Sequence, residues 1–169
     1  GNVILRKKQY EASENAEFSL GVAKNCILGK IYNGKWVLER ATRDHGLQVD
    51  VDALKRASAF MQQSLNYVWE CTDMAQLRGY EGEAASVYFR VFNQLILQQK
   101  KDFKFSGRNK RPPLDNVNAM LSFVYTLLTN MVASALETVG LDPYVGFMHT
   151  DRPGRVSLAL DLIEELRPV

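Results

Sequence analysis

Cysteine and histidine are scarce in this chain. Its 169 residues hold two of each, Cys26, Cys71, His45 and His149. Structural zinc sites take four such ligands at close spacing, and these four residues are spread widely along the chain. Both cysteines lie among apolar residues at helical spacing, which indicates buried, reduced thiols and argues against a disulfide.

Signals for membranes and export are also missing. No apolar run approaches the ~20 residues of a membrane span, and no signal peptide is visible. These absences predict a cytoplasmic protein with no membrane partner. The chain begins with Gly1 and stops within a turn of a helix at "EELRPV". We therefore expect a single helical domain over residues 1–169 that is truncated at both ends.

The composition is that of a folded protein. Apolar residues make up 46% of the chain and charged residues 24%, which excludes a disordered chain and a coiled coil rich in Ala, Glu, Lys and Leu. The formal net charge is only +2, so the total charge gives no argument for nucleic acid binding. The distribution of the charges has to be considered instead.

Apolar residues recur three and four apart along most of the sequence, which predicts an all-α helical bundle. Gly34 and Gly79 are expected to interrupt helices. The second predicted helix carries the apolar stripe Leu54, Ala57, Met61, Leu65, Val68 and Trp69. The helix after the two prolines is apolar on most faces, which is typical of a central helix. The expected ranges are about 14–41, 50–69, 73–77, 80–99, 115–139 and 156–167.

One loop concentrates positive charge. The stretch "KKDFKFSGRNKRPP" has no helical period and ends in two prolines. Six basic residues against the single acid Asp102 give it a charge of about +5, in a chain whose total is +2. This asymmetry favours contact with a phosphate backbone, and a solvated surface loop is the alternative. The basic residues are Lys100, Lys101, Lys104, Arg108, Lys110 and Arg111.

A glutamate enters an apolar helix face in the stretch "GYEGEAASVYF". Helical spacing puts Glu81 on the same face as Ala84 and Ala85, so it should point inward, whereas Glu83 should point to water. A buried carboxylate is costly unless it is paired or binds a metal. Glu81 is therefore either an ion-pair partner or a metal ligand.

More polar chemistry gathers near the end of the chain. His149 follows the apolar stretch "VGFM" in a loop, where a hydrogen-bonded core histidine is the alternative to a ligand. The last predicted helix carries Asp161, Glu164 and Glu165. Spacing alone leaves open which glutamate joins Asp161 in facing one point, and a solvated face is the alternative. Together, three acids and one imidazole suit Mg²⁺ or Mn²⁺, which activate a hydroxyl against a phosphodiester.

Four stretches, in this order, resemble motifs of the CRISPR-associated integrase family, the large protein of the complex that captures spacers. They are "GYEGEAASVYF", "FSGRNKRPPLDNVNAMLSFVYTLL", "GLDPYVGFMH" and "GRVSLALDLIEELRP". The stretch "ILRKKQYEASENAEFSLGVAKNCILGKIYN" is similar to the start of that family's catalytic domain. The order of the motifs makes the resemblance specific.

The resemblance implies a metal-dependent DNA endonuclease and integrase whose helical catalytic domain follows a β domain that this chain lacks. Glu81, His149 and Glu164 match the family's metal ligands, and Asp161 matches a nearby essential acid. The implied cofactor is Mg²⁺ or Mn²⁺. The implied partners are double-stranded spacer precursor and repeat DNA, a second copy of the full-length protein, and a small ferredoxin-like adaptation protein.

The same resemblance concerns DNA contacts. Arg108 and Arg111 match arginines of a family motif, and Lys110 stands where other members often have a third arginine. With Lys104 and Arg155, these residues are our candidates for DNA binding. Family members continue beyond the last ligand with helices that cover the site, so weak or absent activity is expected of this chain alone.

Two other functions fit parts of the sequence. A helical DNA-binding module without catalysis would keep the basic loop and pair the acids with Arg78, Arg152 or Arg155. A metal phosphohydrolase acting on nucleotides is less consistent, because all-α enzymes of that kind usually carry several histidines. Polar residues on one face of the central helix either support a metal site or bond to neighbouring helices. These are Asn118, Ser122 and Tyr125.

Overall fold

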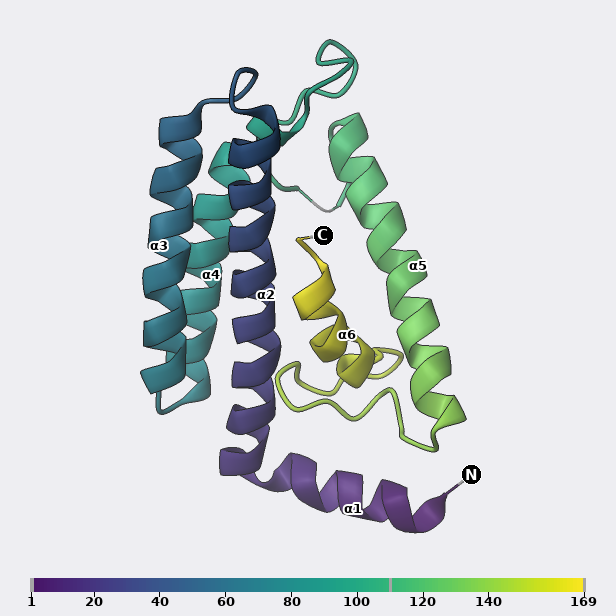
Figure 1. Ribbon diagram of the computed structural model, residues 1–169. Helices are drawn as coiled ribbons and strands as arrows, with labels where there is room; N and C mark the ends of the chain where they lie inside the picture. The colour runs from purple at the N-terminus through teal and green to yellow at the C-terminus, as the bar shows by residue number, and fades with distance from the viewer. Residues whose placement is uncertain (1, 110, 169) are drawn as a thin grey trace.

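The structure is a computed structural model that describes residues 2–109 and 111–168 (Figure 1). Helices and connecting loops make up these ranges, with no strand among them, which confirms the all-α prediction. The α-helices are α1 (Val3–Glu14), α2 (Ala16–His45), α3 (Val51–Glu70), α4 (Met74–Val91), α5 (Asn116–Thr138) and α6 (Ser157–Ile163). Two short 3₁₀ helices follow α4 and α6, η1 (Phe92–Leu95) and η2 (Glu164–Leu166).

The main core lies where α2, α3 and α4 pack together (Figure 1). The predicted stripe of α3 supplies Leu54, Met61 and Val68 to this core, all almost fully buried. Trp69 is the exception, since it is 70% exposed. The prediction placed Trp69 on the wrong side of the helix. Val68 points into the core, and Trp69, the next residue, is rotated by about 100° around the helix axis toward solvent.

Both glycines that were expected to interrupt helices lie inside them. Gly34 is buried within α2, where an added Cβ would lie 2.7 Å from Cε of Met61, so its missing side chain makes room for a neighbouring helix. Gly79 has open space around it in α4. A helical glycine costs only about 1 kcal/mol, which tertiary packing readily offsets. Predicted helices 73–77 and 80–99 are therefore one helix that ends at Val91.

The N-terminal segment forms a helix of its own, because Asn15 ends α1 and its side chain caps α2 through the amide of Phe18. α1 then holds the loop that follows α5. Gln9 is buried and donates to the carbonyls of Asp142 and Val145 at 2.8 and 3.0 Å, and its own carbonyl accepts from the amide of Asp142. This loop leads directly to His149.

α5 is not the central helix that its composition predicted. It lies at the side of the molecule, with α6 packed against one of its faces (Figure 1). Apolar composition predicts that a surface will be buried without saying what covers it, and here α6 covers only one side. The large exposed apolar side chains of α5 are Met120, Phe123, Val124, Leu127 and Met131.

α5 also corrects the expectation about membrane spans. By length and composition alone, its 23 residues are long and apolar enough to cross a membrane, with a mean hydropathy of 1.5 over the best window. Its Asn, Ser and Thr side chains interrupt the apolar run, yet the average stays high enough to pass. The absence of a membrane partner stays a prediction.

Candidate functional site: a caged acid pair beside a held histidine

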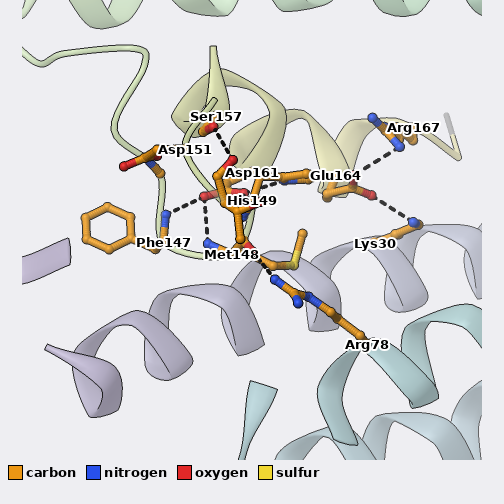
Figure 2. Close-up of polar contacts among 12 residues, drawn as sticks. Lys30, Arg78, Phe147, Met148, His149, Asp151, Ser157, Asp161, Glu164 and Arg167 are labelled. Atoms are coloured by element: carbon orange, nitrogen blue, oxygen red, sulfur yellow. Dashed lines mark hydrogen bonds and ion pairs between the residues drawn. The ribbon is translucent and has the colours of Figure 1, made fainter. Parts of the chain in front are cut away.

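Asp161 organises the loop that carries His149 (Figure 2). Its carboxylate is fully buried and accepts the backbone amides of Phe147, Met148 and His149 at 2.7–3.0 Å. Gly146 allows this close approach, since an added Cβ would lie 2.9 Å from Oδ2 of Asp161. A charged acceptor with several backbone donors fixes the path of the loop firmly.

The same carboxylate holds the ring of His149. Nδ1 of His149 lies 2.6 Å from Oδ1 of Asp161, a hydrogen bond that assigns the proton to Nδ1. The other ring nitrogen, Nε2, then carries the lone pair that a metal or a proton would bind. The spacing suggested that Asp161 and Glu164 face one point, but the structure shows them bonded to different partners. Asp161 bonds to the His149 loop, whereas Glu164 pairs with Lys30 and Arg167.

Glu164 meets Glu81 across a shared cation. Nζ of Lys30 contacts Oε1 of Glu81. It also lies 2.7 Å from Oε2 of Glu164 (Figure 2). Arg167 holds the other oxygen of Glu164 at 3.0 Å. The side chain of Glu164 is 4% exposed, whereas Glu165 is exposed. Of the two glutamates left open by spacing, Glu164 is therefore the one that faces the site.

Two cavities meet at this acid pair. One of about 370 Å³ is lined by Glu81, Glu164 and His149 together with basic residues, which are Arg78, Arg155 and Arg167. The other, of about 600 Å³, is bordered by Glu81, Arg167 and Lys30, and its remaining wall includes aromatic rings and two further arginines. Because Glu81 and Arg167 border both, the acids lie in the middle of a largely cationic trough. Such a trough attracts a phosphodiester.

The donor set fits a hard divalent cation. Two carboxylates already bind one positive charge, and an imidazole nitrogen faces the same cavity, which are ligands that Mg²⁺ and Mn²⁺ accept. Within residues 2–109 and 111–168, however, no three His, Cys, Asp or Glu side chains form a ready-made metal site. Lys30 holds the glutamates instead.

The basic loop is tied down at several points. Phe105 is buried and packs against Phe92, with ring centroids 4.9 Å apart and the rings tilted by 57°. The fully buried Asn118 donates to the carbonyl of Gly107 at 2.8 Å and accepts from Arg108 at 2.8 Å. Asn118 therefore anchors the basic loop, which is neither of the two roles considered for it from the sequence.

The side chains of the candidate DNA-binding residues differ in their exposure to solvent. Arg108 lines the larger cavity, with its guanidinium against the ring of Tyr125, and burial lowers the pKa of Arg108 below the usual arginine value. Lys104 and Arg111 are exposed, and Arg155 lines the smaller cavity. Lys110 lies outside the described residues.

Sequence reasoning missed the basic partners of the acids. Arg78 was considered as a partner of an acid, but it donates to the carbonyl of Met148 at 2.6 Å and so supports the loop (Figure 2). The cations that do pair are Lys30 and Arg167. Lys30 precedes the fully buried Ile31 in α2, and this placement of a lysine beside the apolar stripe is the one signal that marks it.

Comparison with known proteins settles the family. A family model described as "CRISPR associated protein Cas1" matches residues 1–169. The chain belongs to the Cas1 family. A CRISPR-associated endonuclease Cas1 of Rhodospirillum rubrum is 56% identical over 173 residues, which is 100% of this chain and 49% of that protein. Its counterpart in Chlorobaculum tepidum is 48% identical over 167 residues, 99% of this chain and 49% of that protein.

Solved structures of Cas1-like proteins share the fold. A casposase bound to its integration product superposes with a TM-score of 0.80 at 30% identity, over 99% of this chain and 45% of that one. A Cas1 protein from Thermotoga maritima gives 0.77 at 27% identity, over 99% and 49%. The resemblance in the four motifs is thus confirmed. The chain spans about half the length of the curated relatives it matches.

Proposed function

We propose that this Cas1-family chain contributes the catalytic site of a divalent-metal-dependent DNA endonuclease and integrase that acts in CRISPR spacer acquisition. The supporting observation is that Glu81 and Glu164, from two separate elements, meet at one cation beside the held ring of His149. Related proteins are named as endonucleases, and one relative is a casposase bound to an integration product.

The residues divide the work as follows. Glu81, Glu164 and Nε2 of His149 hold the metal, which when bound supplies positive charge to a phosphodiester and to the attacking hydroxyl. Asp161 keeps His149 in the tautomer that exposes Nε2. Arg78 and Arg155 border the cavity and stabilise negative charge on the phosphate. In integration, a 3′-hydroxyl of the captured DNA attacks the repeat strand; with water, the strand is cleaved.

The DNA reaches the site along the cationic trough. Lys104, Lys110, Arg111 and Arg155 contact phosphates, and Arg108 stabilises the basic loop through its hydrogen bonds to Asn109 and Asn118. In the full-length protein, the partners are double-stranded spacer precursor and repeat DNA, a second copy of the protein, and a small ferredoxin-like adaptation protein, in the cytoplasm. Two solved relatives are Cas6-RT-Cas1–Cas2 complexes, which favours a partner of this kind.

A second candidate is a DNA-binding module without catalysis. The observation that favours it is the ion pairing of both glutamates, with Lys30 and Arg167 as their partners. In this alternative, the acids stabilise the fold and only the basic surface is functional.

Neighbouring glutamates separate the two functions. In the full-length protein, Glu164→Gln should abolish Mn²⁺-dependent cleavage of DNA, because it removes a ligand. Glu165→Gln, one residue later and exposed, is the matched control and should cleave as the wild type does. Circular dichroism checks that both variants are folded. Normal cleavage by Glu164→Gln would leave the acids with a structural role and favour the binding module.

A further inference from the structure

Lys30 is an unusual lysine for its surroundings. It projects from α2 beside the fully buried core residues Ile27 and Ile31, and its own side chain is only 15% exposed. Its ammonium contacts carboxylates from two other elements, Glu81 of α4 and Glu164 of η2. Lysine is rarely buried unless it is paired, so the two contacts explain why it is tolerated here.

The two glutamates depend on a cation in return. Carboxylates that share a small, poorly solvated site repel each other unless a positive charge lies between them. Among the contacts of the described residues, Arg167 pairs with the far oxygen of Glu164 and not with Glu81, so it does not bridge the two glutamates. The bridging atom is Nζ of Lys30. The same oxygens would bind a divalent cation, and the ammonium and the metal cannot contact them together at full strength.

We propose that Lys30 is the resident counter-ion of the metal site: its ammonium holds Glu81 and Glu164 in place without metal, and a divalent cation must displace it to bind. This inference rests on the proposed metal function. Lys30 also lines the 600 Å³ cavity, which gives the released ammonium room to turn aside. Lys30 is thus a positioning residue that lowers metal affinity. Without metal, the side chain of Lys30 occupies the place between the two glutamates where the metal would bind.

The test is a metal titration of the full-length protein. Lys30→Met keeps the length of the side chain and removes its charge. Lys35→Met is the matched control, since Lys35 is on the same helix and lies over the ring of Trp36, outside both cavities. Calorimetry gives the Kd for Mn²⁺, and melting with and without Mn²⁺ gives the metal-dependent shift in Tm.

Lys30→Met should bind Mn²⁺ at least about tenfold more tightly than wild type, because the two charge-assisted hydrogen bonds of Lys30 no longer have to be broken. Without metal, its Tm should fall because the carboxylates repel, and saturating Mn²⁺ should raise its Tm by more than that of wild type. Lys30→Arg keeps the charge and should not gain affinity. Lys35→Met should match wild type.

Each other outcome of the titration either rejects or supports a defined proposal. Equal or weaker Mn²⁺ binding by Lys30→Met, with binding retained by wild type, rejects the role of Lys30 and leaves the proposed function standing. No Mn²⁺ binding by any variant rejects both. If Lys30→Met folds only with Mn²⁺, the metal has replaced the ammonium and the inference is supported. If it fails to fold even with Mn²⁺, the inference is wrong.

Discussion

Replacing Asp161 with asparagine should release the loop that carries His149. The carboxylate accepts four hydrogen bonds, two on each oxygen, from three backbone amides and from Nδ1 of His149. An amide side chain keeps one oxygen and puts an NH₂ group in place of the other. Whichever way it is turned, two of the four donors then face another donor.

The size of the effect follows from those two lost bonds. Hydrogen bonds to a charged group contribute about 1.5–3 kcal/mol each, and Asp161 is fully buried, so solvent does not replace them. We expect Asp161→Asn to favour local opening of the 147–149 loop by about 3–5 kcal/mol. The ring of His149 also loses the acceptor that fixes its tautomer.

Amide hydrogen exchange measures this opening directly. In Asp161→Asn, the amides of Phe147, Met148 and His149 should exchange at least about 100-fold faster than in wild type. Amides in the middle of α3 provide the internal reference. Asp151→Asn is the matched control, because that exposed carboxylate makes one long contact, 3.4 Å, with the amide of Gly146. Unchanged exchange of the three amides in Asp161→Asn would refute the reasoning.

Three further predictions concern other parts of the chain. Gly79→Ala, with open space around it, should raise stability by about 1 kcal/mol. Gly34→Ala should gain less, because the end of the buried Met61 side chain must shift to admit a Cβ that would lie 2.7 Å from its Cε; thermal melting of both variants checks the order. Burial, reinforced by nearby carboxylates, raises the pKa of Cys26 to about 12 from the usual 9.0. A disulfide exchange reagent at pH 8 should therefore modify Cys26 only in denaturant, and labelling of the native thiol at the denatured rate would contradict this. Because the folded thiol keeps its proton to higher pH than the unfolded thiol, the contribution of Cys26 to stability should fall as the pH rises above about 9. In the full-length protein, Arg111→Ala should lower the salt slope of DNA binding by about one ion, and an unchanged slope would mean that this residue does not contact phosphate.

Local rules predicted the helices well where one helix face meets one core. The predicted starts at about residues 50 and 115 agree with the structure, in which Asp50 and Asp115 cap α3 and α5 with side-chain acceptors 2.9 and 2.7 Å from the amides they cap. The same rules failed at Gly34 because a glycine in a helix also signals close packing, and that depends on Met61, which is distant in sequence. They also wrongly predicted that α5 is central, because apolar composition does not show which element will pack against a helix face.

The candidate site shows the same division. Helical phase placed Glu81 inward and Glu83 outward, and the structure agrees. The order of motifs, not spacing, singled out Glu164 over Glu165. Nothing in the sequence linked either glutamate to Lys30, because that contact joins residues more than 50 positions apart in one case and more than 130 in the other.

The ion pair and the metal ligand were set against each other as alternatives for Glu81, and the structure shows why that opposition is incomplete. Two carboxylates brought together in a poorly solvated place need positive charge whatever their purpose, so a metal site that is folded without metal must find a cation within the protein. Lys30 meets that need from α2. An ion pair at these glutamates is therefore the arrangement expected of a metal site before metal binds. The two functions are separated by whether Mn²⁺ can take the place of the ammonium.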